Sequence, residues 1–577
     1  MAAAPDAFTL EIVRDKLAAA ADEMGVVLAR TSMSPIVYEV LDFACGILDV
    51  RAQIVAQANG ITLFTGTFGP QVQSIVGKFG LDGMREGDVF ATNVPYDGGT
   101  HTCDVCLVKP IFWQDEVIAF GVSVTHWIEI GGAVPGSISP DATEIFQEGL
   151  QLPGVRVYDG GVLNQTVVDI VRANIRLPQM GIGDLNAGVA AVGIAERRVL
   201  DACERYGLET VLAAFEAILA HGEQLARRAI ARIPNGVYEA EDVIDGDGIT
   251  DDPLPIRVRV TVEDESLHVD FTGCAPQARG PVNCAEGALL SACKTVIRAI
   301  TAPQARSNDG FFRPFSLTVP PGTVFSALPP APTGWYYEGA SYANDLVWKA
   351  LAPVVPDRLG AGCYTSLCAW YVTGREVETG ELFVLAEPNV GGWGGSAGDD
   401  GESGLIATTD GDTYNFPVEV VETRYPLLVE RYALDTPADG GAGEHRGGFG
   451  AVREYRLHGA RDVVAYGSFG LFARRPWALA GGQPGTTNAI EYERGGERLR
   501  FGRVARVELA DGDLARAITG TGGGFGDPRA RPAARVREDV LDGYVTVEQA
   551  RERYGVVLDP ATLELDEQAT AALRGGA

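Results

Sequence analysis

Two apolar runs, 105–112 and 117–124, constrain the fold of this chain more than any other stretch. The short connection between them is polar apart from Trp113. A connection of that length can join two antiparallel strands, so we predict a β-hairpin. The hairpin would bring His101, which precedes the first run, and His126, which follows the second, to the same end of the pair.

Acidic side chains accompany both histidines, because Asp104 follows His101 and Glu129 follows His126 by three positions. Imidazole nitrogen and carboxylate oxygen together suit Zn, Mn or Fe, and such sites commonly keep one position open for water or substrate. A regular strand would place residues 101 and 104 on opposite faces, so a metal site requires a bend at 102–103. The alternative is that each histidine is only a hydrogen-bonding loop residue.

Asp42 lies inside an extended apolar segment, between Leu41 and Phe43. Burying a carboxylate there is costly unless a cation or hydrogen-bond donors meet it. Two hypotheses follow from these residues alone. Asp42 is either a capping or turn residue near the start of a strand, or a third acidic ligand that the fold brings to the two histidines.

The cysteines do not suggest a disulfide framework. There are nine in 577 residues, an odd and scattered set, which is typical of buried thiols. Cys103 and Cys106 form one Cys-x-x-Cys, a pattern found in structural zinc sites and redox pairs. No second pair follows at the spacing of a zinc finger, so we expect neither role.

The charge of the chain excludes whole classes of partner. Its net charge is -30, with 77 acidic against 47 basic residues, and this field repels a nucleic-acid backbone or an anionic membrane. No apolar run reaches the roughly 18 residues that a spanning helix needs, and the N-terminus lacks a basic segment followed by an apolar one. We therefore expect a cytoplasmic protein without nucleic-acid or membrane partners.

Hydrophobic periodicity predicts an α+β fold. Helices are expected over 6–30, 71–79, 185–206, 209–233, 285–301 and 341–353, and Thr546 is expected to cap a last helix that ends at Gly555. Alternating strand patterns begin after Pro234, where we place the first boundary. The predicted regions are a mixed α/β metal-site region (1–235), a mixed β/α middle region (236–420), a β-rich, glycine-rich region (421–530) and a short helical C-terminal tail (531–577).

Three glycine clusters, 388–398, 440–450 and 520–527, invite comparison with phosphate-binding loops. None carries the Lys-Ser/Thr ending of a Walker motif, and 520–526 does not complete G-x-G-x-x-G. We expect mostly tight turns, with a minority lining a ligand pocket. The glycine- and threonine-rich segment 59–70 is also expected to be a loop that lines a pocket.

Motifs in a fixed order over nearly the whole chain carry a specific resemblance. They are LDFACGILD, GDVFATNVPYDGGTHTCDVCLVKPIF, THWIEIGG, EIFQEGLQLP, NIRLPQMGIGDLNAG, RGPVNCAEGALLS, NDGFFRPFSLTVPPGTVFSALPPAP, FPVEVVETRYPLLVERYAL, GEHRGGFGAVREYRL and TGTGGGFGDPRARP. The chain resembles the B-type component of the hydantoinase and oxoprolinase family. That family also includes the metal-bearing subunits of acetone and acetophenone carboxylases and of ATP-dependent caprolactamase.

The resemblance implies a Zn or Mn ion held by Asp, His, Asp and His, which fall on Asp42, His101, Asp104 and His126. It thereby favours the ligand hypothesis for Asp42. The chain departs from the family pattern at Glu129, where Asp is commoner, and at Cys103, where Pro often stands. His126, through the metal, and Glu129, as orienter or proton shuttle, are the predicted catalytic side chains.

The resemblance also implies a partner, because members work with an ATP-binding A-type chain of actin-like kinase fold, in heterotetramers or larger assemblies. The expected function is ATP-dependent hydrolysis of a cyclic amide such as a hydantoin, 5-oxoproline or a lactam. The alternative is ATP-dependent carboxylation of a ketone with bicarbonate, although the length favours the hydrolase or the acetophenone type over acetone carboxylase. A non-enzymatic scaffold that only binds the A-type chain is a third hypothesis, and the intact ligand set argues against it.

Overall fold

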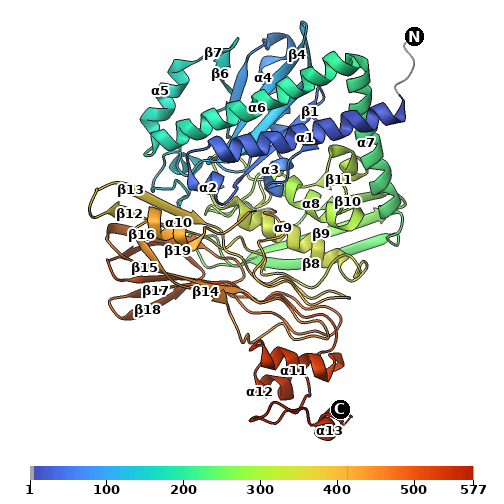
Figure 1. Cartoon of the computed structure of the whole chain (residues 1–577), viewed down its shortest axis with the longest axis vertical. Coiled ribbons are helices and arrows are strands. Elements are labelled where there is room, and N and C mark those ends of the chain that lie inside the picture. The colour runs from blue at the N-terminus through green and yellow to red at the C-terminus, as the bar shows by residue number, and fades with distance from the viewer. Residues whose placement is uncertain (1–5, 412, 576–577) are drawn as a thin grey trace. The chain divides into compact units, whose positions relative to one another are not determined.

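The structure is a computed structural model that describes residues 6–411 and 413–575. The chain forms two compact units, coloured along the sequence in Figure 1. The first unit holds the residues up to Val347 together with Thr409–Phe416, and the second holds Trp348–Thr408 and the residues from Pro417 onward. The four sequence-based regions remain predictions.

A seven-stranded sheet in the first unit carries the apolar hairpin at its centre. Its order is β2-β1-β5-β4-β3-β6-β7, and every pair in it is antiparallel. The strands are β1 (Phe43–Asp49), β2 (Ile54–Gln57), β3 (Val89–Thr92), β4 (Asp104–Trp113), β5 (Glu116–His126), β6 (Val155–Asp159) and β7 (Val162–Leu163). Strands β4 and β5 are buried along most of their length because helices cover them.

Long helices pack against this sheet, and Figure 1 shows α1 and α6 side by side. Helix α1 begins after Asp6, which accepts a hydrogen bond from the Thr9 amide. Helix α6 approaches β5 closely, since a Cβ added to Gly121 would lie 2.7 Å from Ala195 Cβ. The helices of this region are α1 (Ala7–Thr31), α2 (Pro35–Tyr38), α3 (Thr62–Thr65), α4 (Phe68–Phe79), α5 (Gln165–Asn174), α6 (Pro178–Tyr206) and α7 (Leu208–Ile230), with short 3-10 turns η1 (Leu81–Gly83), η2 (Pro95–Asp97) and η3 (Ile145–Glu148).

A second sheet of the first unit has the order β11-β10-β9-β8, in which only β10 and β11 run parallel among the described strands. Its strands are β8 (Gly236–Ile244), β9 (Leu254–Glu263), β10 (Ser266–Asp270) and β11 (Phe315–Thr318). The remaining helices up to the unit boundary are α8 (Glu286–Thr301), η4 (Asp309–Phe312) and α9 (Tyr336–Leu351). Helix α8 contacts α3, α7 and η2, so it links the two halves of the unit.

The second unit is built on two antiparallel sheets, of orders β13-β12-β16-β19 and β14-β15-β20-β17-β18. The strands are β12 (Ala369–Glu376), β13 (Leu382–Glu387), β14 (Leu427–Leu434), β15 (Ala451–Leu457), β16 (Ala460–Ser468), β17 (Ala489–Arg494), β18 (Glu497–Phe501), β19 (Arg503–Leu509) and β20 (Leu514–Ile518). Its helices are α10 (Val418–Arg424), η5 (Pro528–Ala530), α11 (Ala533–Leu541), α12 (Val547–Glu552) and α13 (Glu567–Gly575).

The three glycine clusters pack directly on one another within the second unit. The Gly392 amide donates to the Gly520 carbonyl at 2.9 Å, and the Gly522 amide donates to the Gly448 carbonyl at 3.0 Å. A Cβ on Gly522 would lie 2.1 Å from the Trp393 carbonyl oxygen, which no side chain tolerates. The glycines are therefore required by close backbone contact, a role that the turn and pocket hypotheses did not include.

The predicted α+β class is confirmed, as is the short helical tail. Helices lie at each predicted place, and Thr546 caps α12 through a reciprocal contact with Gln549. Segment 59–70 differs from prediction because it contains α3 and the start of α4 rather than only a loop, and the helix that Thr546 caps ends at Glu552 rather than at Gly555. In the part of the chain that the structure describes, no helix is long and apolar enough to cross a membrane.

Candidate metal centre

The hairpin of β4 and β5 places the two predicted histidines at one end. Trp113 pairs with Glu116 at the connection, and Asp104 stands directly opposite His126 at the other end. The Asp104 amide donates to the His101 carbonyl at 3.2 Å, closing a turn over residues 102–103. Both the hairpin and the bend are as the sequence predicts.

Asp42 joins this end from the neighbouring strand. The register of β1 against β5 pairs Phe43 with Thr125, and the His126 amide donates to the Asp42 carbonyl at 3.1 Å. Residues opposite one another on antiparallel strands share a face of the sheet. Asp42, His126 and Asp104 therefore form a row across three adjacent strands.

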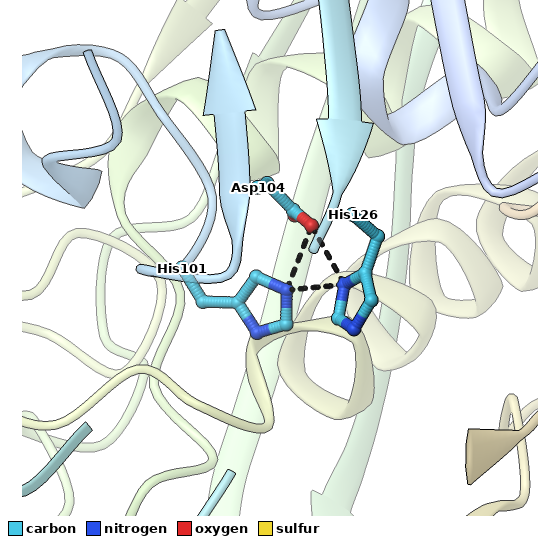
Figure 2. A group of neighbouring side chains, drawn as sticks. All are labelled: His101, Asp104 and His126. Atoms are coloured by element: carbon cyan, nitrogen blue, oxygen red, sulfur yellow. Dashed lines mark hydrogen bonds and ion pairs between the residues drawn. The ribbon is translucent and has the colours of Figure 1, made fainter. Parts of the chain in front are cut away.

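Three side chains meet closely in this row and the preceding turn, as Figure 2 shows. One oxygen of Asp104, Oδ1, lies 2.9 Å from His101 Nε2 and 2.9 Å from His126 Nδ1. The two ring nitrogens are 3.2 Å apart. In a tetrahedral site with bonds of ~2.0–2.1 Å, ligand atoms lie roughly 3.3 Å from one another, so this group has the spacing of metal ligands.

The surroundings orient the His101 ring. His101 Nδ1 lies 2.8 Å from the Gly334 carbonyl oxygen, to which it donates, so Nε2 is the ring nitrogen that faces Asp104. The Tyr336 ring packs edge-on to His101 with centroids 4.9 Å apart. A metal-binding histidine typically donates its other ring N–H in this way, because that bond fixes its tautomer.

The His126 ring has unused binding capacity. Its Nε2 atom is buried and has no hydrogen-bond partner among the described residues. Buried polar atoms are rarely left in that state unless a water, ion or ligand completes them. Nδ1 is the ring atom that faces Asp104 and His101, so the open Nε2 lies on the other side of the ring from the close group.

The electrostatics of Asp104 differ from those of its acidic neighbours. Burial alone would raise its pKa, but the charge of His101 and hydrogen bonds from both histidines outweigh burial and hold the pKa of Asp104 below its usual range. The Thr100 hydroxyl also donates to Asp104 Oδ2 at 2.6 Å. Asp104 is thus kept ionised, as a metal ligand must be.

Asp410 is a residue of this centre that the sequence analysis missed. It is buried, accepts a hydrogen bond from Thr413, and interacts electrostatically with Asp104 and His126. Burial raises its pKa to about 6. An aspartate before glycine is typical of a turn, so no local signal marks Asp410 as functional.

Asp42 is half-buried, and its carboxylate lies outside the close group of three. Burial, followed by the negative charges of Asp104 and Asp410, raises the pKa of Asp42 to about 8 against the opposing effect of His126. Burial and the same three carboxylates raise the pKa of the Tyr336 phenol, which also hydrogen-bonds Asp104.

A divalent cation fits these donors. Three carboxyls and two imidazoles converge, and among the described residues only His126 offers Asp42 and Asp410 positive charge. Carboxylates that are desolvated together resist ionisation unless a cation compensates them. The close group of His101, Asp104 and His126 is a possible three-ligand metal site, and Asp42 lies outside it.

Glu129 is buried but faces other partners. Its carboxylate accepts hydrogen bonds from the Gly131 amide at 2.9 Å, from the Arg176 amide and from Arg176 Nη1 at 2.6 Å. These contacts hold the loop that follows His126. They suit the orienting role predicted for Glu129 more than the shuttle role.

Cys103 and Cys106 are buried free thiols, like all nine cysteines, so the expectation of thiols rather than disulfides is confirmed. Burial raises the pKa of Cys103 well above its usual value, and the negative charge of Asp104 adds to this effect. Neither sulfur belongs to the close group of possible ligands.

Known proteins match this chain over almost all of its length. A family model described as hydantoinase B/oxoprolinase matches residues 6–528. A protein of Pseudomonas sp. (strain NS671) that is named as the B component of a D-/L-hydantoinase is 34% identical, covering 99% of this chain and 98% of its own.

Two solved structures share the fold. The ATP-dependent caprolactamase of Pseudomonas jessenii aligns with a TM-score of 0.91 at 28% identity, covering 99% of this chain and 100% of that one. A nucleotide-free acetone carboxylase also gives a TM-score of 0.91, at 20% identity over 99% of this chain and 82% of that one, which shows a common fold alone. The resemblance carried by the sequence motifs is thus confirmed, and the chain belongs to the hydantoinase B/oxoprolinase family.

Proposed function

We propose that this chain is the metal-bearing component of an ATP-dependent enzyme that opens cyclic amides. The observation that carries the proposal is the buried group of His101, Asp104 and His126, whose nitrogen and oxygen atoms lie within 4.8 Å of one another. Family membership supports the reaction class, because relatives are named as a hydantoinase component and an ATP-dependent caprolactamase.

The metal is Zn or Mn in this proposal, held by His101, Asp104, His126 and Asp42. When bound, such an ion polarises a carbonyl or lowers the pKa of a coordinated water towards neutrality. Ionisation of Asp42, whose pKa is about 8 without a cation, would accompany binding. The Gly334 carbonyl keeps the His101 ring in place throughout.

Asp410 is the proposed proton-transfer residue. It is buried close enough to Asp104 and His126 to sense their charge, and a pKa of about 6 allows it to accept a proton near neutral pH. Glu129, bound by Arg176 and the Gly131 amide, instead holds the loop after His126. It is a positioning residue here.

A separate A-type chain holds the ATP in this proposal. Opening an unstrained lactam or imide ring needs coupling to ATP, and the glycine clusters of this chain use their backbone groups on each other rather than on phosphate. The hydantoinase relative is named as one component of its enzyme, which supports a partner chain. We extend the proposal to a cytoplasmic heterotetramer, which the mass of the reconstituted complex would test.

Reconstitution with the A-type chain tests the reaction. With ATP and a panel of hydantoin, 5-oxoproline and caprolactam, we expect ring-opened product and ADP in proportion, and no label from ¹⁴C-bicarbonate in the product. Ketone carboxylation, the alternative, would instead fix the label into an acid when acetone or acetophenone is supplied. ATP-independent ring opening, or turnover with the metal fully removed, would contradict the proposal.

A further inference from the structure

A second polar cavity lies in the first unit, beside α8. Its volume is about 660 Å³, within the range that small-molecule sites occupy. Segment 57–66, the second half of α8 and segment 303–307 form its walls, together with Gly411. Helices α3 and α8 pack closely here, because a Cβ on Gly66 would lie 2.7 Å from Ser291 Cα.

The lining of this cavity is cationic, unlike the chain as a whole. Lys294, Arg298 and Arg306 line it, and Asp22 is the acidic residue among its described lining residues. The whole chain carries a net charge of -30, so a cavity with this balance is unusual for its surface. Hydroxyl and amide side chains complete the polar part of the lining, among them Thr62, Thr65, Thr295, Gln57 and Asn59.

Two of the three cations are already balanced by carboxylates. Lys294 Nζ lies 2.8 Å from Asp309 Oδ1, and both side chains are largely buried. Arg306 Nη2 lies 3.1 Å from Asp22 Oδ2 at the exposed rim. Neither cation requires a ligand to be satisfied.

Arg298 has no such partner. Its Nη2 donates to the Ala305 carbonyl at 2.7 Å, and its guanidinium stacks over the Phe311 ring at 3.8 Å. Its Nη1 is buried without a hydrogen-bond partner, and no described carboxylate pairs with it. Desolvation, unopposed by any acid, lowers the pKa of Arg298 to about 10.

A purely structural role explains this arrangement poorly. The contact with Phe311 and the bond to Ala305 use the guanidinium, but they leave its Nη1 without a partner and its charge without a carboxylate. A half-buried cation in that state destabilises the fold. Acidic residues are abundant in this chain, yet none of those described stands beside Arg298. The unmatched charge is accounted for if an anion from outside completes the cavity.

The geometry points to an oxyanion site in this cavity, in which Arg298 pairs with the carboxylate or phosphate group of a small molecule and the neighbouring hydroxyls and amides hydrogen-bond it. Helix α8 connects this site to the region of the metal centre. Gly287, near the start of α8, packs on the turn before His101, and Arg298 lies eleven residues further on, about 16 Å along the helix at 1.5 Å per residue. Gly411, which follows Asp410, lines the same cavity.

Calorimetric titration of the full-length chain with inorganic phosphate, and separately with succinate, tests this site at an ionic strength held constant with sodium chloride. We expect saturable binding of at least one anion, and Arg298→Gln should weaken it at least tenfold. Binding of phosphate but not succinate would identify a phosphoryl ligand. Binding of succinate but not phosphate would identify a carboxylate ligand. The control is Arg198→Gln, an exposed arginine paired with Glu23, which should bind like the wild type.

Equal binding by the wild type and Arg298→Gln, or no saturable binding of either anion, would overturn the inference. A variant-free measurement covers the case in which Arg298→Gln does not fold. Phenylglyoxal modification of the wild type, followed by mass spectrometry, should be slowed at least fivefold at Arg298 by the bound anion and unchanged at Arg198. Equal rates at Arg298 with and without anion would count against the site.

Discussion

Two carboxyls of the metal centre and one carboxyl of an ion network in the second unit have pKa values that are shifted in opposite directions. In the network, Arg531 Nη1 lies 2.6 Å from Asp400 Oδ1, and its Nε lies 2.8 Å from Asp539 Oδ2. Burial would raise the pKa of Asp400, but hydrogen bonds and charge from Arg531 outweigh it and lower that pKa. In the metal centre, Asp42 and Asp410 have raised pKa values.

The difference separates a place where the fold supplies its own counter-charge from places where a ligand would supply it. The network contains its own cations, and they lower the pKa of Asp400. The metal centre gathers acids without a lysine or arginine among their described electrostatic partners, and the cavity beside α8 holds an arginine without an acid. At both proposed binding sites, therefore, the charges of the described residues do not balance one another.

The largest expected effect comes from His126→Ala. Removing this ligand should abolish bound metal and lower ATP-dependent ring opening by about 10³-fold or more, because several kcal/mol of transition-state stabilisation depend on the ion. Elemental analysis and turnover of the reconstituted pair measure the two effects. The exposed histidine His458 supplies the control, His458→Ala. An active, metal-free His126→Ala would refute the assignment.

Arg531→Met should lower the free energy of unfolding and leave the metal content unchanged. Half-buried Asp400 and buried Asp539 would lose their nearest cation and keep only the longer contacts to Arg446. Breaking a buried ion pair from one side costs about 3–5 kcal/mol, which is the upper bound here. Urea unfolding gives the free energy, and elemental analysis under native conditions should show an unchanged metal content. Arg198→Met, which breaks an exposed pair with Glu23, should cost no more than ~1 kcal/mol. If both variants lost the same free energy of unfolding, the network around Arg531 would be no stronger than an exposed ion pair. The contrast with the metal centre would then fail.

Asp410→Asn separates proton transfer from metal binding. We expect kcat to fall about 10²-fold, in the range of lost general acid–base catalysis, with metal content near that of the wild type. Asp42→Asn should do the reverse and weaken metal affinity first. The pH dependence of kcat should lose its acid limb in Asp410→Asn, and in the metal-loaded wild type that limb should lie below the pKa of about 6 that Asp410 has without a cation. An unaltered profile would exclude Asp410 from the reaction.

The last expected effect is a pH dependence of the stability of the metal-free chain. The folded-state pKa of Asp42 is about 8, above its ordinary value of 3.8, so the folded state binds more protons between these limits than the unfolded state does. Stability should then fall as pH rises from about 4 to 8, by at most ~1.4 kcal/mol per pH unit for this carboxyl. Thermal unfolding across this range measures the slope, which Asp42→Asn should flatten and added Zn should reverse. If stability instead rose with pH, the raised pKa of Asp42 would be wrong. The protein's own groups would then supply the positive charge that we assign to the metal.

Local patterns predicted much of the fold. The three- and four-residue periodicity located α1, α6, α7 and α8, and two apolar runs with a short connection located the hairpin that carries His101 and His126. Segment 59–70 escaped prediction because its helices are too short to show a period, and α3 has only four residues. Short helices depend on tertiary packing, which in this case comes from α8.

Within the candidate site, the sequence pointed to the histidines and Asp104 of the hairpin, and it missed side chains that come from later in the chain. Asp104 and His101 are neighbours in a turn, and Asp42 became a candidate through family motifs. Asp410 and Tyr336 reach the same place from much later in the chain, and neither belongs to a motif that names a role.

By itself, the sequence determined the elements whose causes are local: periodic helices, the hairpin and its bend, the Thr546 cap, and the thiol state of the cysteines. Only the tertiary structure decided which distant groups share a buried volume. It set the pKa of Asp410, left Arg298 without a counter-charge and pressed glycine backbones together. The physical reason is that desolvation and Coulomb energy depend on separation in space, which spacing along the chain does not specify.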